Sequence, residues 1–299
     1  MDFNLQRSYS IPPYQNRLLK LLISAVFHIF CLVWNFFRKC TRQKKRGYYV
    51  SIYYHGVCPE LRIRFAKQLS VLTKLTRPIP ANFKGGKDSS KPLCIVSFCD
   101  GFQCFLENAL PELIKYNIPA TVFIPSNYIG LHPEWDSDNK YKSTCNNQKV
   151  MSAEQLKRLP HDSIRIGSHS MSHTKLTLLE YNKAKQELFQ SIHDLETITE
   201  YDVKFFFFPY GVCNDLLLKL AHDAGYERVF TGIPKLSSTL DEEFEIGSIS
   251  VDPMDWHLEF KLKLLGAYRW LPVAISAKHK LSNFFKKSFL LNWFGRKSS

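Results

Sequence analysis

Short apolar segments alternate with segments of helical periodicity along the middle of the chain. The apolar segments predict strands at residues 47–54, 93–98, 120–124, 163–167, 205–208, 228–231 and 245–251. The amphipathic segments predict helices at residues 63–75, 109–116, 178–199 and 215–224. This alternation is typical of β-α units built around a parallel sheet, and about seven strands in one domain favour a barrel. The polar, irregular residues 131–149 predict an insertion loop at the active edge of that barrel.

The two ends of the chain differ from the middle in charge. The 299 residues include 40 Lys and Arg and 27 Asp and Glu, which gives a net charge of +13. Residues 1–47 carry nine of these bases and a single acid, and residues 260–299 carry nine bases and no acid. The middle is therefore mildly acidic. We predict three regions: a membrane-associating N-terminal region (1–47), a barrel (48–259) and a basic amphipathic tail (260–299).

An apolar segment at residues 21–37 predicts a helix near the N-terminus. Its 17 residues lie at the lower limit for crossing a bilayer, which takes about 20 residues. If it spans, the basic residues that follow it keep the barrel on the cytoplasmic side. If it does not span, it can lie in the plane of the interface, and a third alternative is an ordinary helix packed on the barrel. We expect a peripheral or single-pass protein at the cytoplasmic face of an anionic membrane.

The C-terminal region alternates Leu, Phe and Trp with Lys and Arg, which also suits the membrane–water boundary. Because its bases are not interleaved with polar residues and Gly, we expect no nucleic-acid partner. The eight cysteines form no C-x-x-C pair, which disfavours a zinc ribbon, and their scatter favours a reducing compartment.

Three polar clusters follow predicted strands, at residues 97–102, 167–173 and 207–211. Active sites of barrels gather at the carboxyl ends of their strands, so these clusters are the candidate chemistry. The first contains Asp100, the second contains His169 and His173, and the third ends in Pro-Tyr-Gly. One carboxylate and two imidazoles make three ligands and leave a metal open to water, which is the catalytic arrangement.

The order and spacing of these clusters resemble the polysaccharide deacetylases (the NodB-homology domain, carbohydrate esterase family 4). Residues 97–102 with 118–123 resemble the first motif, residues 165–173 the second, and residues 208–211 the third. The segment Tyr54-His55-Gly56-Val57 resembles the opening segment of members associated with exopolysaccharide synthesis. The resemblance covers residues 48–231 and implies an α/β fold, a distorted (β/α)7-type barrel.

The resemblance also implies an activity and a site. The activity is hydrolysis of N-acetyl, or alternatively O-acetyl, groups of a polysaccharide or lipid-linked glycan. Asp100, His169 and His173 would hold a divalent metal, usually zinc, although this ligand set also suits cobalt, nickel or manganese. The backbone N–H of Tyr210 would stabilise the oxyanion. The residues expected to contact substrate are His55, Pro209, Tyr210 and Trp256.

The sequence departs from the family pattern at the base. The first motif has two adjacent acids, of which the first is the general base, but here that position is Cys99. The third motif often has an Arg where this chain has Phe207. The thiol of Cys99 can ionise as a weak base, coordinate the metal, or mark the loss of the base. That loss motivates an alternative function, a non-catalytic glycan-binding or scaffold subunit of a polysaccharide-assembly complex.

The family's later motifs are harder to place. Residues 252–256 resemble the fourth motif in spelling but lie 43 residues beyond Pro209. The family's late general-acid histidine has no obvious counterpart, and His257 is the candidate for that role.

Overall fold

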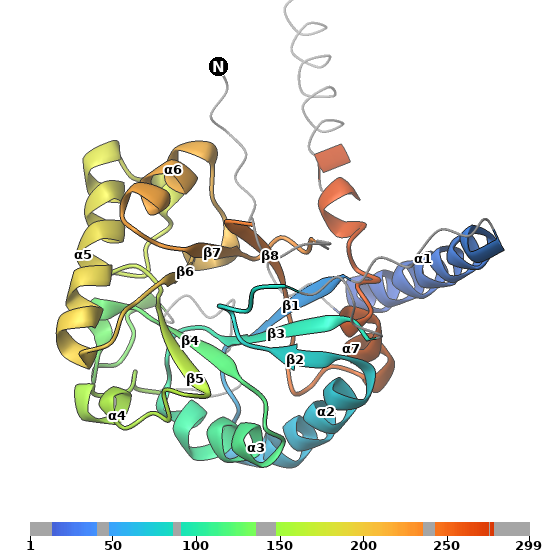
Figure 1. Cartoon of the computed structure of the whole chain (residues 1–299), viewed down its shortest axis with the longest axis horizontal. Helices are drawn as coiled ribbons and strands as arrows, with labels where there is room; N and C mark the ends of the chain where they lie inside the picture. Colours follow the sequence, from blue (N-terminus) through green and yellow to red (C-terminus); the bar gives the residue numbers. More distant parts are fainter. Residues whose placement is uncertain are drawn as a thin grey trace, which may run out of the picture.

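Seven parallel strands close into a barrel in the computed structural model of the chain (Figure 1). The structure describes residues 14–40, 48–85, 91–135, 148–235, 243–274 and 276–277. The barrel strands are β1 (Tyr49–Tyr54), β3 (Leu93–Phe98), β4 (Ala120–Ile124), β5 (Ile164–Ser168), β6 (Phe205–Phe207), β7 (Arg228–Thr231) and β8 (Glu245–Ser250). They follow the order β1-β8-β7-β6-β5-β4-β3, and β3 pairs with β1 to close the ring. The predicted strands and barrel are confirmed.

The barrel is irregular where β3 meets β4. One edge of β3 pairs with β1 from Leu93 to Phe98. The other edge is divided, because its first half pairs with the short strand β2 (Arg77–Ile79) and Ser97 and Phe98 pair with β4. The strand β2 was not predicted, since three residues that include a proline give no alternating pattern. The added strand distorts the barrel at this point.

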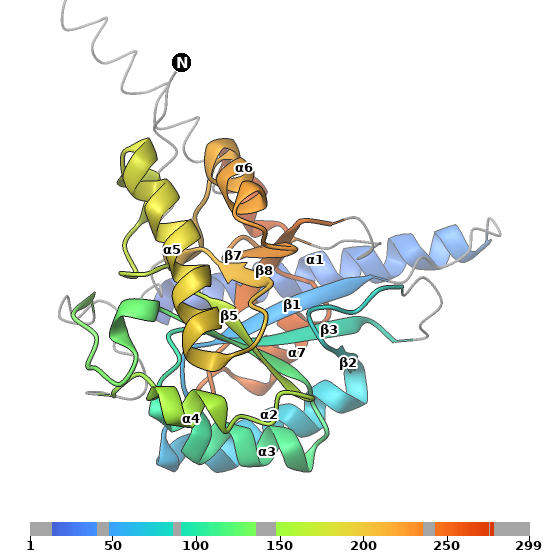
Figure 2. The same cartoon turned by 60° about the vertical axis from the view of Figure 1, so that its left-hand side comes forward.

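Helices cover the outside of the barrel (Figures 1 and 2). They are α2 (Arg62–Leu75), α3 (Leu110–Lys115), α4 (Ala153–Lys157), α5 (Tyr181–Thr199), α6 (Asp215–Asp223) and α7 (His257–Leu264). A π-helical turn at Phe105–Ala109 precedes α3, and short 3-10 turns lie at Pro59–Leu61, Ser126–Tyr128, Leu176–Leu178 and Pro209–Gly211. The predicted helices that correspond to α2, α3, α5 and α6 are confirmed. Helix α4 is one turn long, too short for a periodic signal.

Alternate side chains of each strand fill the inside of the barrel. Leu93 and Ile95 of β3 belong to the interior cluster, whereas Cys94 and Val96 pack outward against the helices. The interior is largely aromatic, and the ring of Phe207 lies 5.3 Å from the ring of Phe123 and 6.2 Å from that of Phe230. These rings form an apolar floor beneath the carboxyl ends of the strands. We call these strand ends the carboxyl edge of the barrel.

A long N-terminal helix, α1 (Tyr14–Cys40), packs against α7 on the outside of the barrel. The predicted helix at residues 21–37 is therefore confirmed within a longer helix. Figures 1 and 2 show that α1 continues past the barrel and projects from it. Residues 16–34 are long and apolar enough to cross a membrane by length and composition. Such a helix fits a membrane anchor as well as a signal sequence.

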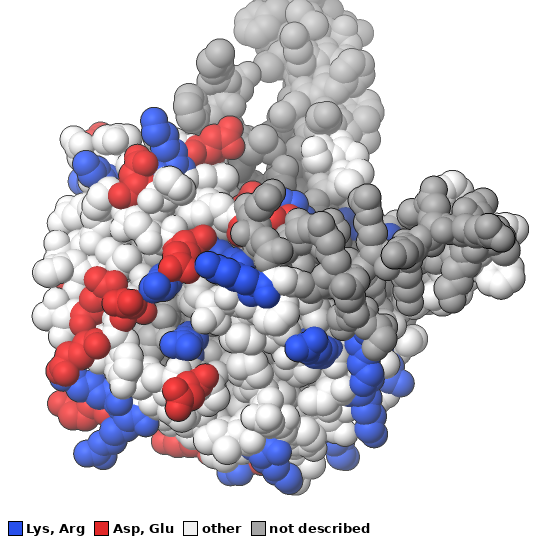
Figure 3. All heavy atoms as spheres, viewed as in Figure 1, with Lys and Arg blue, Asp and Glu red and all other residues white. Residues whose placement is uncertain are grey.

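Part of the predicted insertion loop and most of the predicted C-terminal tail lie outside the described residues. The beginning of the tail is described and packs on the barrel, because Leu262, Leu264, Tyr268 and Leu271 are buried. On the face of the barrel shown in Figure 3, basic and acidic side chains are interspersed.

Candidate metal centre

A carboxylate and two imidazoles converge at the carboxyl edge of the barrel. Asp100 follows β3, and His169 and His173 follow β5. One ligand atom from each of the three lies within 4.8 Å of the others, and all three residues are buried. The Nε2 atoms of His169 and His173 lie 3.6 Å and 3.2 Å from Oδ1 of Asp100. The sequence prediction that these three side chains come together is therefore matched by the geometry.

The backbone at this site adopts left-handed conformations that non-glycine residues rarely take. The φ angle is 69° at Asp100, 55° at His173 and 60° at Tyr210. Each such residue costs of the order of 1 kcal/mol, and such residues persist only where the surrounding structure enforces them. Three of them, from three separate strand ends, indicate that the edge is shaped to aim these groups inward.

One hydrogen bond fixes the orientation of the His169 ring. Its Nδ1–H donates to the backbone carbonyl of Phe207 at 2.6 Å, because a carbonyl oxygen can only accept. The Nε2 atom therefore carries the lone pair and points toward Asp100. A histidine ligand held in this way by a backbone carbonyl is the usual arrangement around protein-bound metals.

The electrostatics of the group favour the protonation states that bind a cation. Burial, together with the neighbouring His173, lowers the pKa of His169 to about 3, so this imidazole is neutral. Burial alone would raise the pKa of Asp100, but its close contact with the His173 imidazole holds it well below its usual range. A neutral imidazole and an ionised carboxylate are the forms that ligate metals.

Two buried atoms of the group lack a hydrogen-bond partner among the described residues. They are Oδ1 of Asp100 and Nδ1 of His173. An unsatisfied buried carboxylate oxygen is costly and calls for an explanation. A divalent cation fits here, because hard oxygen and imidazole nitrogen donors are ligands that zinc and neighbouring metals accept. The residues present therefore fit a divalent metal, and this set of donors does not select one metal.

Aromatic side chains surround His173. The ring of Trp135 stacks on it with centroids 4.2 Å apart, and the ring of Tyr210 lies 5.2 Å away. Tyr210 is 40% exposed and follows the buried Pro209, so the predicted Pro-Tyr-Gly cluster reaches the rim of the site. Trp135 was not singled out from the sequence, although its place in the predicted insertion loop was a usable signal.

His55 lies at the same edge of the barrel. It follows β1, is exposed, and its ring lies 5.5 Å from that of Tyr53. His55 is one of the groups that lower the pKa of Asp100, which is consistent with a position beside the ligand group. The structure thus brings His55, Pro209 and Tyr210 to the edge that holds the candidate ligands.

Cys99 packs into the interior cluster at the floor of the site. It is 2% exposed and belongs to the same apolar cluster as Phe123 and Phe207. Burial raises the pKa of its thiol well above the ordinary value, and the nearby Asp100 carboxylate raises it further. The thiol is therefore protonated at neutral pH, a state in which it cannot accept a proton as a base.

Trp256 and His257 lie at the start of α7. The guanidinium of Arg17 lies 4.6 Å above the Trp256 ring, so this side chain takes part in the contact between α1 and α7. His257 is exposed and begins the helix that packs against α1 and α2. The role of Trp256 in substrate binding stays a prediction. The role of His257 as general acid also stays a prediction.

Glu187 on α5 holds the loop that carries both histidines. Its carboxylate accepts from the backbone N–H groups of Met171 and Ser172, at 2.9 Å and 3.0 Å, and from the Ser172 hydroxyl. These bonds fix the turn between His169 and His173. The sequence gives no signal for this role, because a glutamate on an amphipathic helix is normally a solvated residue.

Replacing Glu187 with glutamine should weaken metal binding about tenfold, because an amide offers one acceptor oxygen in place of two and loosens the loop. The affinity for zinc would be measured by competition with a chromophoric chelator. Glu180→Gln is the matched control, since Glu180 is exposed and makes no side-chain cap at the start of the same helix. Equal affinities of the two variants would contradict this role of Glu187.

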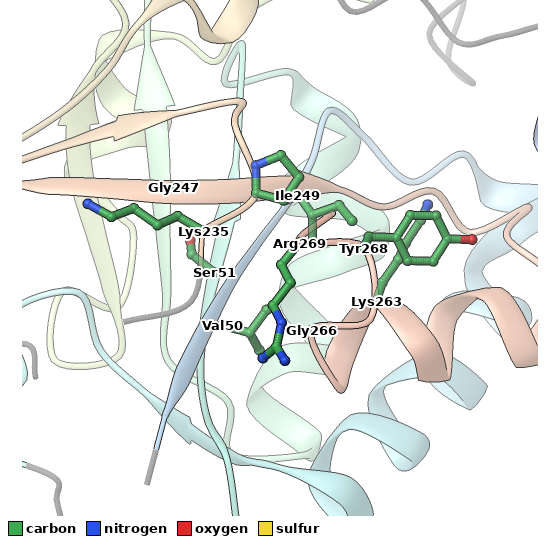
Figure 4. A pocket seen from close by; sticks show the side chains of 10 residues that line it. Val50, Ser51, Lys235, Gly247, Ile249, Lys263, Gly266, Tyr268 and Arg269 are labelled. Atoms are coloured by element: carbon green, nitrogen blue, oxygen red, sulfur yellow. The ribbon is translucent and has the colours of Figure 1, made fainter. Parts of the chain in front are cut away.

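A pocket lies outside the barrel, between β1, β8 and the loop after α7 (Figure 4). Its lining includes the basic residues Lys235, Lys263 and Arg269 and none of the three candidate metal ligands. Figure 4 shows Arg269 on this loop, beside β1. This pocket is thus separate from the metal centre.

Comparisons with known proteins agree with the fold and with the ligand group. The profile of the family described as polysaccharide deacetylase matches residues 86–229. YxkH of Bacillus subtilis, a polysaccharide deacetylase by name, is 24% identical over 167 residues, which are 56% of this chain and 54% of YxkH. The poly-β-1,6-N-acetyl-D-glucosamine N-deacetylase of Staphylococcus epidermidis is 27% identical over 146 residues, 46% of each protein.

A solved structure, IcaB from Ammonifex degensii, superimposes with a TM-score of 0.61 at 20% identity and covers 76% of this chain and 98% of its own. At this identity the likeness concerns the fold. Residues 86–229 of this chain are therefore similar in sequence to the polysaccharide deacetylase family, and the barrel and the Asp-His-His group agree with that similarity. The chain spans about half the length of the curated relatives that it matches.

Proposed function

We propose that the protein removes acetyl groups from a polysaccharide or a lipid-linked glycan by metal-dependent hydrolysis. The observation that carries this proposal is the buried group of Asp100, His169 and His173 at the carboxyl edge of the barrel. Three protein ligands leave coordination positions for water and substrate, whereas structural metal sites are closed by protein ligands.

The residues would divide the chemistry as follows. Asp100, His169 and His173 would hold the cation, which when bound supplies a Lewis acid and lowers the pKa of water. The backbone N–H of Tyr210 would donate to the acetyl carbonyl oxygen as that oxygen gains negative charge. The exposed ring of Tyr210 would pack on a sugar ring at the rim, with Pro209 fixing the turn and His55 at the carboxyl end of β1.

The metal and the substrate are part of the proposal. Zinc is the metal that we propose, since it is the usual one in this family. N-acetylhexosamine polymers are supported as substrate by the name of the staphylococcal relative, a poly-β-1,6-N-acetyl-D-glucosamine N-deacetylase. Action at the cytoplasmic face of a membrane, on nascent or lipid-linked glycan, is supported by the apolar helix α1 and by the basic residues after it.

A second function is favoured by one observation, the environment of Cys99. Its thiol is buried among apolar side chains where the family has its base. Losing a positioned base costs about 10²–10⁴-fold in rate. A protein that keeps the metal site and the rim but lacks the base would bind glycan as a scaffold subunit of a polysaccharide-assembly complex.

Incubation of the zinc-loaded full chain with β-1,6-linked N-acetylglucosamine oligomers tests which function holds. The products would be weighed by mass spectrometry, and binding would be titrated in parallel. Loss of acetyl mass beyond that seen with Asp100→Asn supports the deacetylase. Binding without loss of mass favours the scaffold function. O-acetylated oligomers, run alongside, show whether the ester or the amide is cleaved.

A further inference from the structure

Helix α1 is fastened to the barrel by polar contacts along one side. Arg17 donates from Nε and Nη2 to Glu259 on α7, at 2.8 Å and 2.7 Å. Two turns further on, the hydroxyl of Ser24 accepts from the indole N–H of Trp270 at 2.9 Å. Two turns beyond that, Arg269 lies 3.1 Å from the sulfur of Cys31. Positions 17, 24 and 31 repeat every seven residues, so they share one face of the helix.

The contact of Arg17 with α7 is part of a largely buried network of charged side chains. Glu259 and Asp255 are buried, and Lys263 is bonded to Asp255 at 2.7 Å and lies 3.4 Å from Glu259. The two buried carboxylates therefore share Lys263, which comes from the same segment of the chain. Arg17 of α1 supplies the second positive charge. Removing one member of such a network leaves a buried charge without its partner, which is costly. The barrel is thus adapted to hold α1 in this position.

The rest of α1 is apolar and exposed. Twelve of the 23 large hydrophobic side chains that the described residues expose lie on this helix. They are Leu18, Leu19, Leu22, Ile23, Val26, Ile29, Phe30, Leu32, Val33, Trp34, Phe36 and Phe37. An exposed apolar surface of this extent marks an interaction site. The chain around it is strongly basic, because residues 1–47 contain nine Lys and Arg and one acid.

The contacts between α1 and the barrel restrict how α1 can bind a membrane. The stretch from Arg17 to Cys31 is about 21 Å long at 1.5 Å per residue, most of the roughly 30 Å that a bilayer core requires. If this stretch crossed the bilayer while docked, Asp255, Glu259 and Arg269 would enter hydrocarbon, which is strongly unfavourable. Residues 32–40, beyond the last docked position, are too few to span. A docked α1 can therefore meet lipid only by lying along the surface.

We propose that α1 is an in-plane membrane anchor that stays clamped to the barrel and binds the interface of an anionic bilayer. It is a fixed part of the folded protein, neither a spanning helix nor a flexible tether. Its free faces enter the boundary between headgroups and acyl chains, and the basic composition of residues 1–47 favours an anionic surface. The proposal does not depend on the catalytic activity of the barrel.

Flotation of the full chain with vesicles tests the anchor. Phosphatidylcholine vesicles with 30 mol% phosphatidylglycerol should bind it, and pure phosphatidylcholine vesicles should bind it more weakly. The double variant Phe30→Ser/Trp34→Ser removes two stacked, outward-facing rings and should weaken binding at least tenfold. Ile63→Ser/Ile114→Ser removes exposed apolar side chains of α2 and α3 and should bind like the wild type. Equal binding of both variants, or no binding of the wild type, overturns the proposal.

Two further measurements separate the clamped helix from the alternatives. Carbonate at pH 11 should release the wild-type protein from the membranes of expressing cells, whereas retention means a spanning helix and overturns the proposal. A thiol cross-linker about as long as an arginine side chain should join native Cys31 to Arg269→Cys while the protein is on vesicles. Cys31→Ser in the same background is the control. If the protein binds vesicles but the cross-link between positions 31 and 269 does not form, α1 has left the barrel on the membrane and acts as a flexible tether. That result would refute the proposal.

Discussion

Replacing Cys99 with aspartate should lower the free energy of unfolding by about 3 kcal/mol, because the new carboxylate would be buried without a partner. Cys99 is 2% exposed and shares its cluster with Phe207, the position where the family often has an arginine. Two positions at which the resemblance implies charged groups thus carry apolar groups in one cluster here. Urea denaturation of the metal-free protein would measure the effect.

A double-mutant cycle makes this prediction specific. Phe207→Arg alone should also destabilise the barrel, since it buries an isolated guanidinium. The double variant Cys99→Asp/Phe207→Arg should be more stable than the sum of the two single effects by at least 1 kcal/mol, because the charges pair. It should also release acetate about 10²–10⁴-fold faster than the wild type by restoring the base. Additive effects on stability would show that positions 99 and 207 do not face each other.

The second large effect is expected from His169→Ala. This variant removes one of three ligands and should weaken zinc binding by more than 100-fold, beyond the loss typical of residues that only support a ligand. Isothermal titration with zinc would measure it. His169 is neutral and bonded to the Phe207 carbonyl, so its nitrogen facing Asp100 is available to a cation.

His222→Ala is the control for that experiment. His222 lies on α6, and its side chain is 75% exposed, so losing it should leave zinc affinity unchanged. Stoichiometric zinc binding that survives His169→Ala at wild-type affinity would place the metal elsewhere on the chain.

The sequence predicted the barrel because each strand has its own signal. The run of four phenylalanines at 205–208 predicts a buried strand, and alternate members of it do fill the interior and face the helices. The three candidate ligands were predictable for a similar reason. Parallel strands end at one edge, so polar clusters after β3 and β5 must meet there.

Other features depend on long-range contacts that leave no local pattern. Glu187 supports the histidine loop from a helix that looks amphipathic and ordinary. The apolar run of α1 left a spanning helix, an interfacial helix and an ordinary packed helix open, and the contacts of Arg17 and Ser24 with the far end of the chain could not be read from it. The burial of Cys99 likewise depends on Phe123 and Phe207, which lie on two other strands.

The most direct test of the proposed function is acetate release as a function of bound metal. The full chain would be stripped with a chelator, reloaded with one equivalent of zinc, and incubated with N-acetylglucosamine oligomers. We predict slow release that requires zinc, disappears in Asp100→Asn and His173→Ala, and returns when zinc is restored to the wild type. Release that is unchanged by stripping, or zinc-loaded wild type that binds the oligomers and releases no acetate, would contradict a metal-dependent deacetylase.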